Sequence, residues 1–248
     1  MRIKVINPNT TQSMTDKIGA CARAAARPGT EVIAVSPAMG PVSIESHYDE
    51  ALATPGLLAE IAAGEAAGVD AYLIACFGDP GLKAARELAR GPVLGIAEAA
   101  MHAASFIGSR FTVVTTLART MGQAHHLAEA YGMARFCARV RACELPVLEL
   151  EEPRSNARAR IADECRRALD EDDCDVLVLG CAGMADLCRS LSAELGVPVI
   201  DGVSAGVTLL ESLVSLGLKT SKRGELAHPL PKPMTGLMQP FALGSGAR

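Results

Sequence analysis

The stretch AYLIACFGDPG, residues 71–81, is an apolar, strand-like run that ends on a cysteine and continues into a glycine-containing turn. The stretch DVLVLGCAGMAD, residues 175–186, repeats this organisation in the second half of the chain. Aligning the two stretches places Cys76 on Cys181, and a glycine stands two residues after each cysteine. Self-similarity of this kind indicates that one supersecondary unit occurs twice. We therefore predict two similar halves that each deliver a thiol to the end of a buried strand.

The segments around both stretches alternate between strand-like and helix-like patterns, which is typical of parallel sheets covered by helices. Strands are expected at 3–7, 31–35, 71–76 and 93–96 in the first half and at 111–116, 139–145, 176–181 and 198–202 in the second. Helices are expected at 11–26, 55–67, 80–89, 97–107, 120–131, 155–169, 184–195 and 204–216.

The predicted fold class is α/β, with two similar α/β/α domains that each contain a four-stranded parallel sheet. We expect residues 1–100 plus 205–248 to form the first domain, including a C-terminal helix and tail, and residues 101–204 to form the second. A pseudo-twofold axis would relate the two domains, and the active site would lie in the cleft between them.

Composition, charge and cysteine spacing argue against several classes of protein. A net charge of −4 and an aromatic content of 3% argue against a nucleic-acid partner, which needs basic and stacking side chains. No apolar run reaches the length of about 18 residues that a membrane span needs, and no apolar signal region precedes the first strand. The eight cysteines form no C-x-x-C pair and the histidines form no zinc motif. We expect a cytoplasmic enzyme with reduced thiols and no bound metal.

Ligand sites of parallel α/β sheets lie at the carboxyl ends of the strands. Small polar groups, the two thiols and glycines are gathered at these ends, and long cationic side chains are nearly missing. The candidates are Asn9, Thr10, Phe77, Gly78, Thr115, Thr116, Ala182 and Gly183. Asn9 and Thr10 have a second interpretation as helix caps, and capping is compatible with ligand binding. Glu98 begins a predicted helix and either orients Cys76 or a ligand, or simply favours the helix dipole as a first-turn acid.

The cysteines divide into two groups. Cys21, Cys165 and Cys188 fall on apolar helix stripes and are interpreted as packing residues, and no chemistry is assigned to Cys137, Cys143 and Cys174. Cys76 and Cys181 differ because they occupy equivalent positions at strand ends, just before predicted helices. Free N–H groups and the helix dipole at such a place are expected to lower a thiol pKa from about 8.5 towards neutrality.

Two acid/base groups that face each other across a site can invert a carbon stereocentre bearing a weakly acidic hydrogen. One thiolate removes the proton from one face, and the opposite thiol returns a proton to the other face. The groups exchange roles in the reverse direction, so the symmetry of the two halves matches that of the reaction. Donors near the enolate oxygen would stabilise the intermediate. No cofactor is needed for this chemistry.

The sequence resembles the aspartate/glutamate racemase superfamily and, within it, the hydantoin racemases. The resemblance rests on INPNT (6–10), GPVSIESHYDEALATPGLL (40–58), IACFGDPG (74–81) and LGCAGMADL (179–187), and it extends over nearly the whole chain. It implies a pair of α/β domains, an acid/base role for Cys76 and Cys181, and a homo-oligomer. It also implies that Asn9, Thr10, Ile44, Thr115, Thr116 and Gly183 line the substrate pocket.

One departure from the superfamily bears on the substrate. Amino-acid racemases of the superfamily typically have Asn-Thr after each cysteine, whereas this chain has Phe77-Gly78 and Ala182-Gly183. An uncharged ring such as a 5-substituted hydantoin therefore fits better than a free amino acid, and Phe77, Ile44 and Met184 provide an apolar wall or serve in packing. The alternative functions are an allantoin racemase, a two-lobed small-molecule binding protein and, third, a redox or metal protein.

Overall fold

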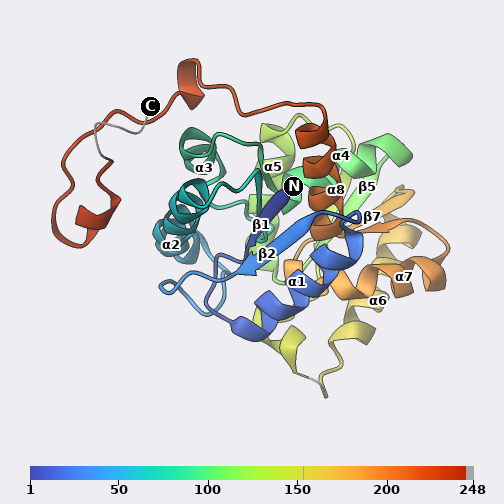
Figure 1. Ribbon diagram of the computed structural model, residues 1–248. Helices are drawn as coiled ribbons and strands as arrows, with labels where there is room; N and C mark the ends of the chain where they lie inside the picture. The colour runs from blue at the N-terminus through green and yellow to red at the C-terminus, as the bar shows by residue number, and fades with distance from the viewer. Residues whose placement is uncertain (153, 244–248) are drawn as a thin grey trace.

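The computed structural model describes residues 1–152 and 154–243 and shows two lobes, each built on a four-stranded parallel sheet (Figure 1). The first sheet has the order β2-β1-β3-β4, and the second has the order β6-β5-β7-β8. The strands are β1 (Arg2–Ile6), β2 (Glu31–Val35), β3 (Ala71–Ile74), β4 (Val93–Gly95), β5 (Phe111–Thr115), β6 (Cys137–Ala142), β7 (Val176–Leu179) and β8 (Val199–Ile200). All neighbouring strands pair in parallel. The matching strand orders confirm the predicted pseudo-twofold relation of two α/β units.

Helices cover both sheets. They are α1 (Gln12–Ala25), α2 (His47–Ala66), α3 (Leu82–Leu88), α4 (Ile96–Ile107), α5 (Met121–Ala130), α6 (Ala157–Glu171), α7 (Cys188–Leu195) and α8 (Gly202–Ser215). Short 3-10 helices are η1 (Ala118–Thr120), η2 (Val147–Glu151), η3 (Ala182–Leu187), η4 (Gly224–Leu226) and η5 (Gly236–Phe241). No helix of the described residues combines the length and the apolar character needed to cross a bilayer.

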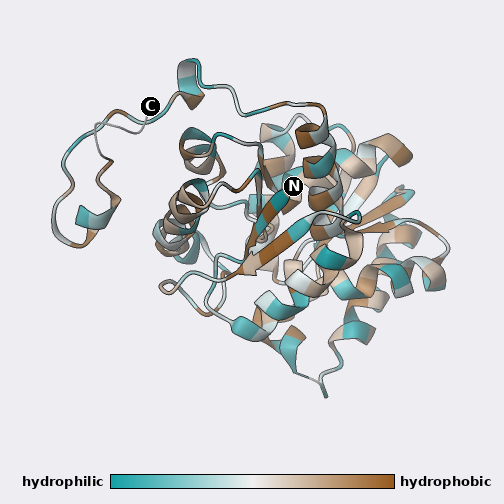
Figure 2. Ribbon diagram, viewed as in Figure 1, coloured by the Kyte–Doolittle hydropathy of each residue, from teal (hydrophilic) through white to brown (hydrophobic). Residues whose placement is uncertain are grey.

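The inner strands of both sheets form the core. Side chains such as Ile3, Leu73, Val113 and Val178 are fully buried against the covering helices. The strands are largely hydrophobic, whereas helices at the outside such as α1 and α6 carry hydrophilic residues as well (Figure 2). This pattern is expected where both faces of a parallel sheet are covered.

Helix α8 packs against α1, α4 and β3. After α8, the chain is anchored to the first lobe because Thr220 Oγ1 donates to the Gly91 carbonyl at 2.6 Å and Lys222 Nζ donates to the Glu87 carbonyl at 3.0 Å. It then runs past α3 and forms an extended loop beyond α2 (Figure 1). The division into 1–100 plus 205–248 and 101–204 stays a prediction, and residues 153 and 244–248 of these ranges lie outside the described residues.

Helix α2 begins at His47, eight residues before the predicted start at 55. Ser46 caps this helix by accepting the Asp49 N–H at 3.2 Å, and the Ser46 hydroxyl donates to the Asp49 carboxylate at 2.7 Å. The predicted start at 55 was wrong, and Pro55 lies inside the helix. The S-x-x-D cap and the acidic first turn determine the true start. The earlier start places Glu50 on a helix instead of a loop.

Strands β3 and β7 end before the cysteines that the predicted strands 71–76 and 176–181 included. β3 ends at Ile74, and α3 begins only at Leu82, after Gly81 with its left-handed φ of 67°. β7 ends at Leu179, and Cys181 is followed by the 3-10 helix η3 instead of an α-helix. Both thiols therefore lie in turns, and neither is placed at the first turn of a long α-helix.

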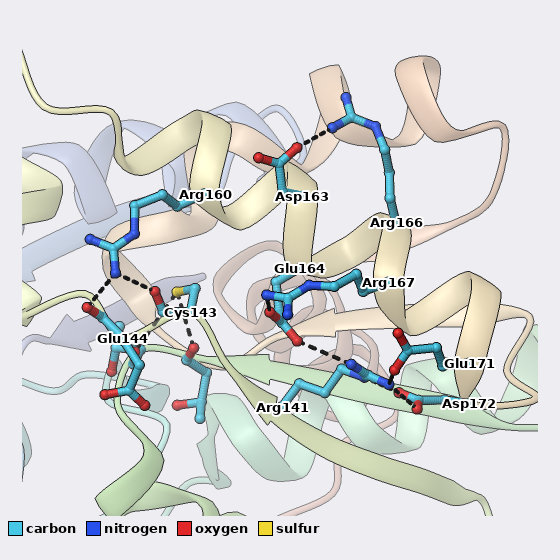
Figure 3. Close-up of polar contacts among 12 residues, drawn as sticks. Arg141, Cys143, Glu144, Arg160, Asp163, Glu164, Arg166, Arg167, Glu171 and Asp172 are labelled. Atoms are coloured by element: carbon cyan, nitrogen blue, oxygen red, sulfur yellow. Dashed lines mark hydrogen bonds and ion pairs between the residues drawn. The ribbon is translucent and has the colours of Figure 1, made fainter.

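A buried ionic cluster joins β6 to α6 in the second lobe (Figure 3). The Arg141 guanidinium contacts Glu164 at 3.2 Å, Glu171 at 2.7 Å and both oxygens of Asp172. Burial raises the pKa of Asp172, but the hydrogen bond and charge of Arg141 outweigh burial and hold this pKa below its ordinary value. The hydrogen bonds to the same carboxylates raise the pKa of Arg141. The cluster fixes the end of α6 against the sheet edge.

Candidate active site

A cavity of about 50 Å³ lies between the two lobes, at the carboxyl ends of their central strands. Every residue predicted for the site except Thr10 and Gly183 lines it. The predicted residues that line it are Asn9, Ile44, Cys76, Phe77, Gly78, Thr115, Thr116, Cys181 and Ala182. The structure therefore brings the two cysteines of the internal repeat to one cavity, each from its own lobe.

The two thiols have equivalent surroundings. Both are partly buried, and each receives a backbone N–H from the glycine two residues later, Gly78 for Cys76 and Gly183 for Cys181. Gly78 lines the cavity, whereas Gly183 belongs to the Cys181 turn without lining it. The pseudo-twofold relation of the lobes thus extends to the hydrogen bonding of the thiols.

The expected lowering of the thiol pKa values is wrong for this structure. Burial raises the pKa of Cys181 to about 11, although the Gly183 N–H and the Lys17 charge act in the opposite direction. Burial also raises the pKa of Cys76, beyond the effect of the Gly78 N–H, and the Glu50 carboxylate raises it further. The physical reason is that desolvation of a thiolate outweighs single N–H contacts when no long helix begins at the thiol.

The turn that carries Cys76 is held by Asp79. The Asp79 N–H donates to the Cys76 carbonyl at 3.0 Å, and Asp79 adopts a left-handed φ of 45°. Its carboxylate accepts the N–H groups of Ala97 at 3.1 Å and Glu98 at 3.0 Å and the Tyr131 hydroxyl at 2.7 Å. Burial raises the pKa of Asp79 to about 7 despite these hydrogen bonds. Asp79 thereby joins the Cys76 turn to the start of α4 and to the residue after α5.

A second set of contacts holds the 3-10 helix η2 of the second lobe against the first lobe. The Lys17 ammonium donates to the Leu150 carbonyl at 3.1 Å and pairs with Glu151 at 2.8 Å. The Glu45 carboxylate accepts the Val147 N–H at 2.6 Å. Since Val147 lines the cavity and Glu45 follows Ile44, these contacts cover the cavity from both lobes.

The remaining candidates have these positions. Asn9 Oδ1 accepts the Thr11 N–H and an Asn7 amide hydrogen, each at 2.9 Å, so Asn9 both orders the start of α1 and lines the cavity. Thr10 instead bonds the Pro41 carbonyl and holds the loop that contains Ile44. Glu98 pairs with Arg86 at 2.5 Å and does not line the cavity. Met184 is packed in the core of the second lobe.

The sequence prediction missed several residues that line the cavity, namely Met14, Glu50, Ala75, Thr120, Gln123, Ala124, Val147 and Gly180. Glu50 was assigned to a loop, although the S-x-x-D cap before it carried the signal for a helix. No comparable signal marks Gln123, which reaches the cavity from α5. Within the described residues, no three His, Cys, Asp or Glu side chains are placed to share a metal ion.

Comparisons with known proteins agree with this geometry. The model of the Asp/Glu/Hydantoin racemase family matches residues 3–210. A hydantoin racemase from Pseudomonas sp. (strain NS671) is 48% identical over 97% of this chain and 97% of its own length. The solved structure of an allantoin racemase from Klebsiella pneumoniae is 56% identical, with a TM-score of 0.96 and coverage of 98% of this chain and 99% of its own.

A solved allantoin racemase from Pseudomonas fluorescens is 41% identical, with a TM-score of 0.89 over 95% of this chain and 100% of its own. These similarities extend across both lobes, and the span matched by the family model contains both cysteine turns. They confirm the resemblance that the sequence motifs indicated. The chain therefore belongs to the Asp/Glu/hydantoin racemase family.

Proposed function

We propose that this protein racemises a 5-substituted hydantoin at carbon 5 by a two-base mechanism that uses no cofactor. The proposal rests on the positions of Cys76 and Cys181, which line one small cavity from opposite lobes. The similarity to hydantoin and allantoin racemases supports the same reaction class. A pure binding protein would need the cavity but would have no use for two equivalent thiols.

In the proposed reaction, one cysteine acts as thiolate and the other as thiol. The thiolate takes the hydrogen of carbon 5 as a proton, and the electron pair of the broken C–H bond moves into the adjacent carbonyl to form an enolate. The opposite thiol then donates its proton to the other face of carbon 5, which regenerates the carbonyl and leaves that cysteine as thiolate. The next turnover of the inverted enantiomer restores the starting protonation.

The cavity lining fits an uncharged ring. Among the described residues, neither a lysine nor an arginine lines the cavity, so no cation there would pair with the carboxylate of a free amino acid. The Asn9 amide and the Thr115 and Thr116 hydroxyls provide small polar groups for ring carbonyl and N–H groups, and Ile44 and Phe77 provide apolar contacts. Allantoin is a hydantoin with a ureido substituent, and the Klebsiella similarity makes it the second substrate to test.

The first experiment follows optical rotation of an enantiomerically pure 5-alkylhydantoin and of pure allantoin in deuterium oxide. We expect rotation to decay faster than the spontaneous rate, with one deuterium incorporated at carbon 5, because the returned proton comes from solvent-exchanged thiols. Mass spectrometry of the product measures the incorporation. Decay at only the spontaneous rate with both compounds would favour the small-molecule binding protein.

We expect kcat/KM for racemisation to rise between about pH 7 and pH 9. Both thiol pKa values are raised by burial, that of Cys181 to about 11, so raising the pH increases the thiolate fraction by up to about tenfold per pH unit. The rate falls again once both thiols are ionised, and the two limbs report pKa values of the pair. Initial rates, corrected for spontaneous racemisation at each pH, measure the profile, and a profile that is flat from pH 6 to 9 contradicts the raised values.

The Lys17→Met variant tests the cause of this pH dependence. The Lys17 charge lowers the pKa of Cys181, so its removal should move the rising limb to higher pH. Lys83→Met is the control, because Lys83 pairs with Glu225 on the exposed surface and does not line the cavity. If the rising limb of the kcat/KM profile stays at the same pH in Lys17→Met, a group other than Lys17 sets the ionisation that the limb reports.

A further inference from the structure

Two polar side chains from opposite lobes meet at the edge of the cavity. Glu50 comes from α2 and Gln123 comes from α5, and Gln123 Nε2 donates to Glu50 Oε1. Both side chains line the cavity beside Gly78. A Cβ at Gly78 would overlap Glu50 Oε1 and lie 2.6 Å from Gln123 Nε2. The glycine of the Cys76 turn thus leaves the space that this pair occupies.

The negative charge of the Glu50 carboxylate is only partly compensated by its neighbours. No lysine or arginine of the described residues pairs with it, and its neighbour His47 lies 3.4 Å away with a side chain that is 78% exposed. A carboxylate accepts about four hydrogen bonds, so the bond from Gln123 leaves acceptor capacity towards the cavity. When a substrate displaces water, a carboxylate without donors is costly to desolvate. A well-matched substrate must therefore bring N–H donors to Glu50.

A ureido group has the matching chemistry. Its N–H groups can donate in parallel to a carboxylate, as planar donor pairs do, and its carbonyl can accept from the Gln123 amide. An alkyl or aryl substituent offers no donor and would leave Glu50 desolvated. A substituent bearing a carboxylate would repel Glu50.

We propose that Glu50 and Gln123 form a recognition site for a ureido substituent on carbon 5, so that the protein selects allantoin over hydantoins with alkyl substituents. This inference rests on the proposed racemisation and assigns the specificity that the cysteines alone do not determine. Sites that hydrogen-bond a polar group reject analogues lacking it far more strongly than apolar pockets reject a size difference. Glu50 and Gln123 act on the substituent, whereas Cys76 and Cys181 act on carbon 5.

The test compares kcat/KM for allantoin and for 5-isobutylhydantoin in the wild type and in Glu50→Gln, Gln123→Leu and the control Glu129→Gln. Glu129 is exposed on α5 and does not line the cavity. The wild type should prefer allantoin, and both cavity variants should lower the allantoin-to-isobutylhydantoin ratio by at least about tenfold, the loss expected for one unmatched buried hydrogen bond. Glu129→Gln should leave the ratio unchanged.

The ratio is the decisive quantity because the Glu50 charge also raises the pKa of Cys76, an effect that acts on both substrates equally. An unchanged ratio with lower rates for both compounds would overturn the recognition site while leaving the racemase proposal intact. Preference of the wild type for isobutylhydantoin would also overturn it. If neither compound is racemised, the proposed function fails, and calorimetric Kd values for allantoin decide separately whether Glu50→Gln weakens binding.

Discussion

Replacing Cys76 with serine is expected to abolish racemisation, with kcat reduced by at least about 10³-fold, and Cys181→Ser should do the same. A serine hydroxyl fills nearly the same space but is far too weak an acid to exchange a proton with carbon 5 near neutral pH, so the variant loses one of its two acid/base groups. The remaining thiol can still remove a proton from one face and return a solvent-derived one to the same face. Each variant should therefore exchange the carbon 5 hydrogen of one enantiomer only, and the two variants should act on opposite enantiomers.

The experiment incubates each pure enantiomer with each variant in deuterium oxide and follows deuterium content and optical rotation in parallel. Cys143→Ser is the control, because the Cys143 thiol is buried, donates to the Thr115 carbonyl at 3.2 Å and does not line the cavity. We expect it to retain racemisation. Near-normal racemisation by both Cys76→Ser and Cys181→Ser would refute the two-base mechanism, and exchange of the same enantiomer by both would refute the assignment of one thiol to each face.

The fold was largely predictable because the sequence pattern that indicates it occurs twice in the chain. Equivalent apolar runs before Cys76 and Cys181 indicate equivalent inner strands, and parallel α/β sheets place the ends of inner strands on one edge. The repeat predicts that each cysteine lies at the end of an inner strand, and the docking of the two lobes brings both to one cavity. The same argument predicted that Asn9, Thr115 and Thr116 line the cavity.

The features that were missed depend on contacts between distant segments. Helix α2 starts earlier than predicted because Ser46 and Asp49 cap it, and it continues through Pro55. Gln123 lines the cavity because the lobes are docked at a particular angle, and no local pattern encodes that angle. Burial raises the thiol pKa values, which is why an argument from helix dipoles alone gave the wrong direction.

The buried cluster around Arg141 leads to the largest expected effect on stability (Figure 3). Arg141→Met should lower the free energy of unfolding by about 3–5 kcal/mol, because removing one partner leaves buried carboxylates without their cation. The Glu164 and Asp172 side chains are 5% and 0% exposed, and neither can turn to water without moving α6. Methionine has a similar length and is apolar, so the loss reports the uncompensated charges more than a cavity.

Arg166→Met is the control, because Arg166 lies on α6, the helix that carries Glu164 and Glu171. Arg166 pairs with Asp163 and Glu194, but its side chain is 48% exposed, and exposed pairs contribute about 0–1 kcal/mol. Urea unfolding followed by circular dichroism compares the midpoints of the variants. The double variant Asp172→Asn with Arg141→Met should recover part of the stability that Arg141→Met loses.

Because the folded pKa of Asp172 lies below its unfolded value, the contribution of the cluster is present above about pH 4 and is lost as the pH falls through the folded pKa. Arg141→Met should therefore narrow its stability gap to the wild type in acid, and an equal shift of both arginine variants at neutral pH would show that the cluster contributes no more than a surface pair.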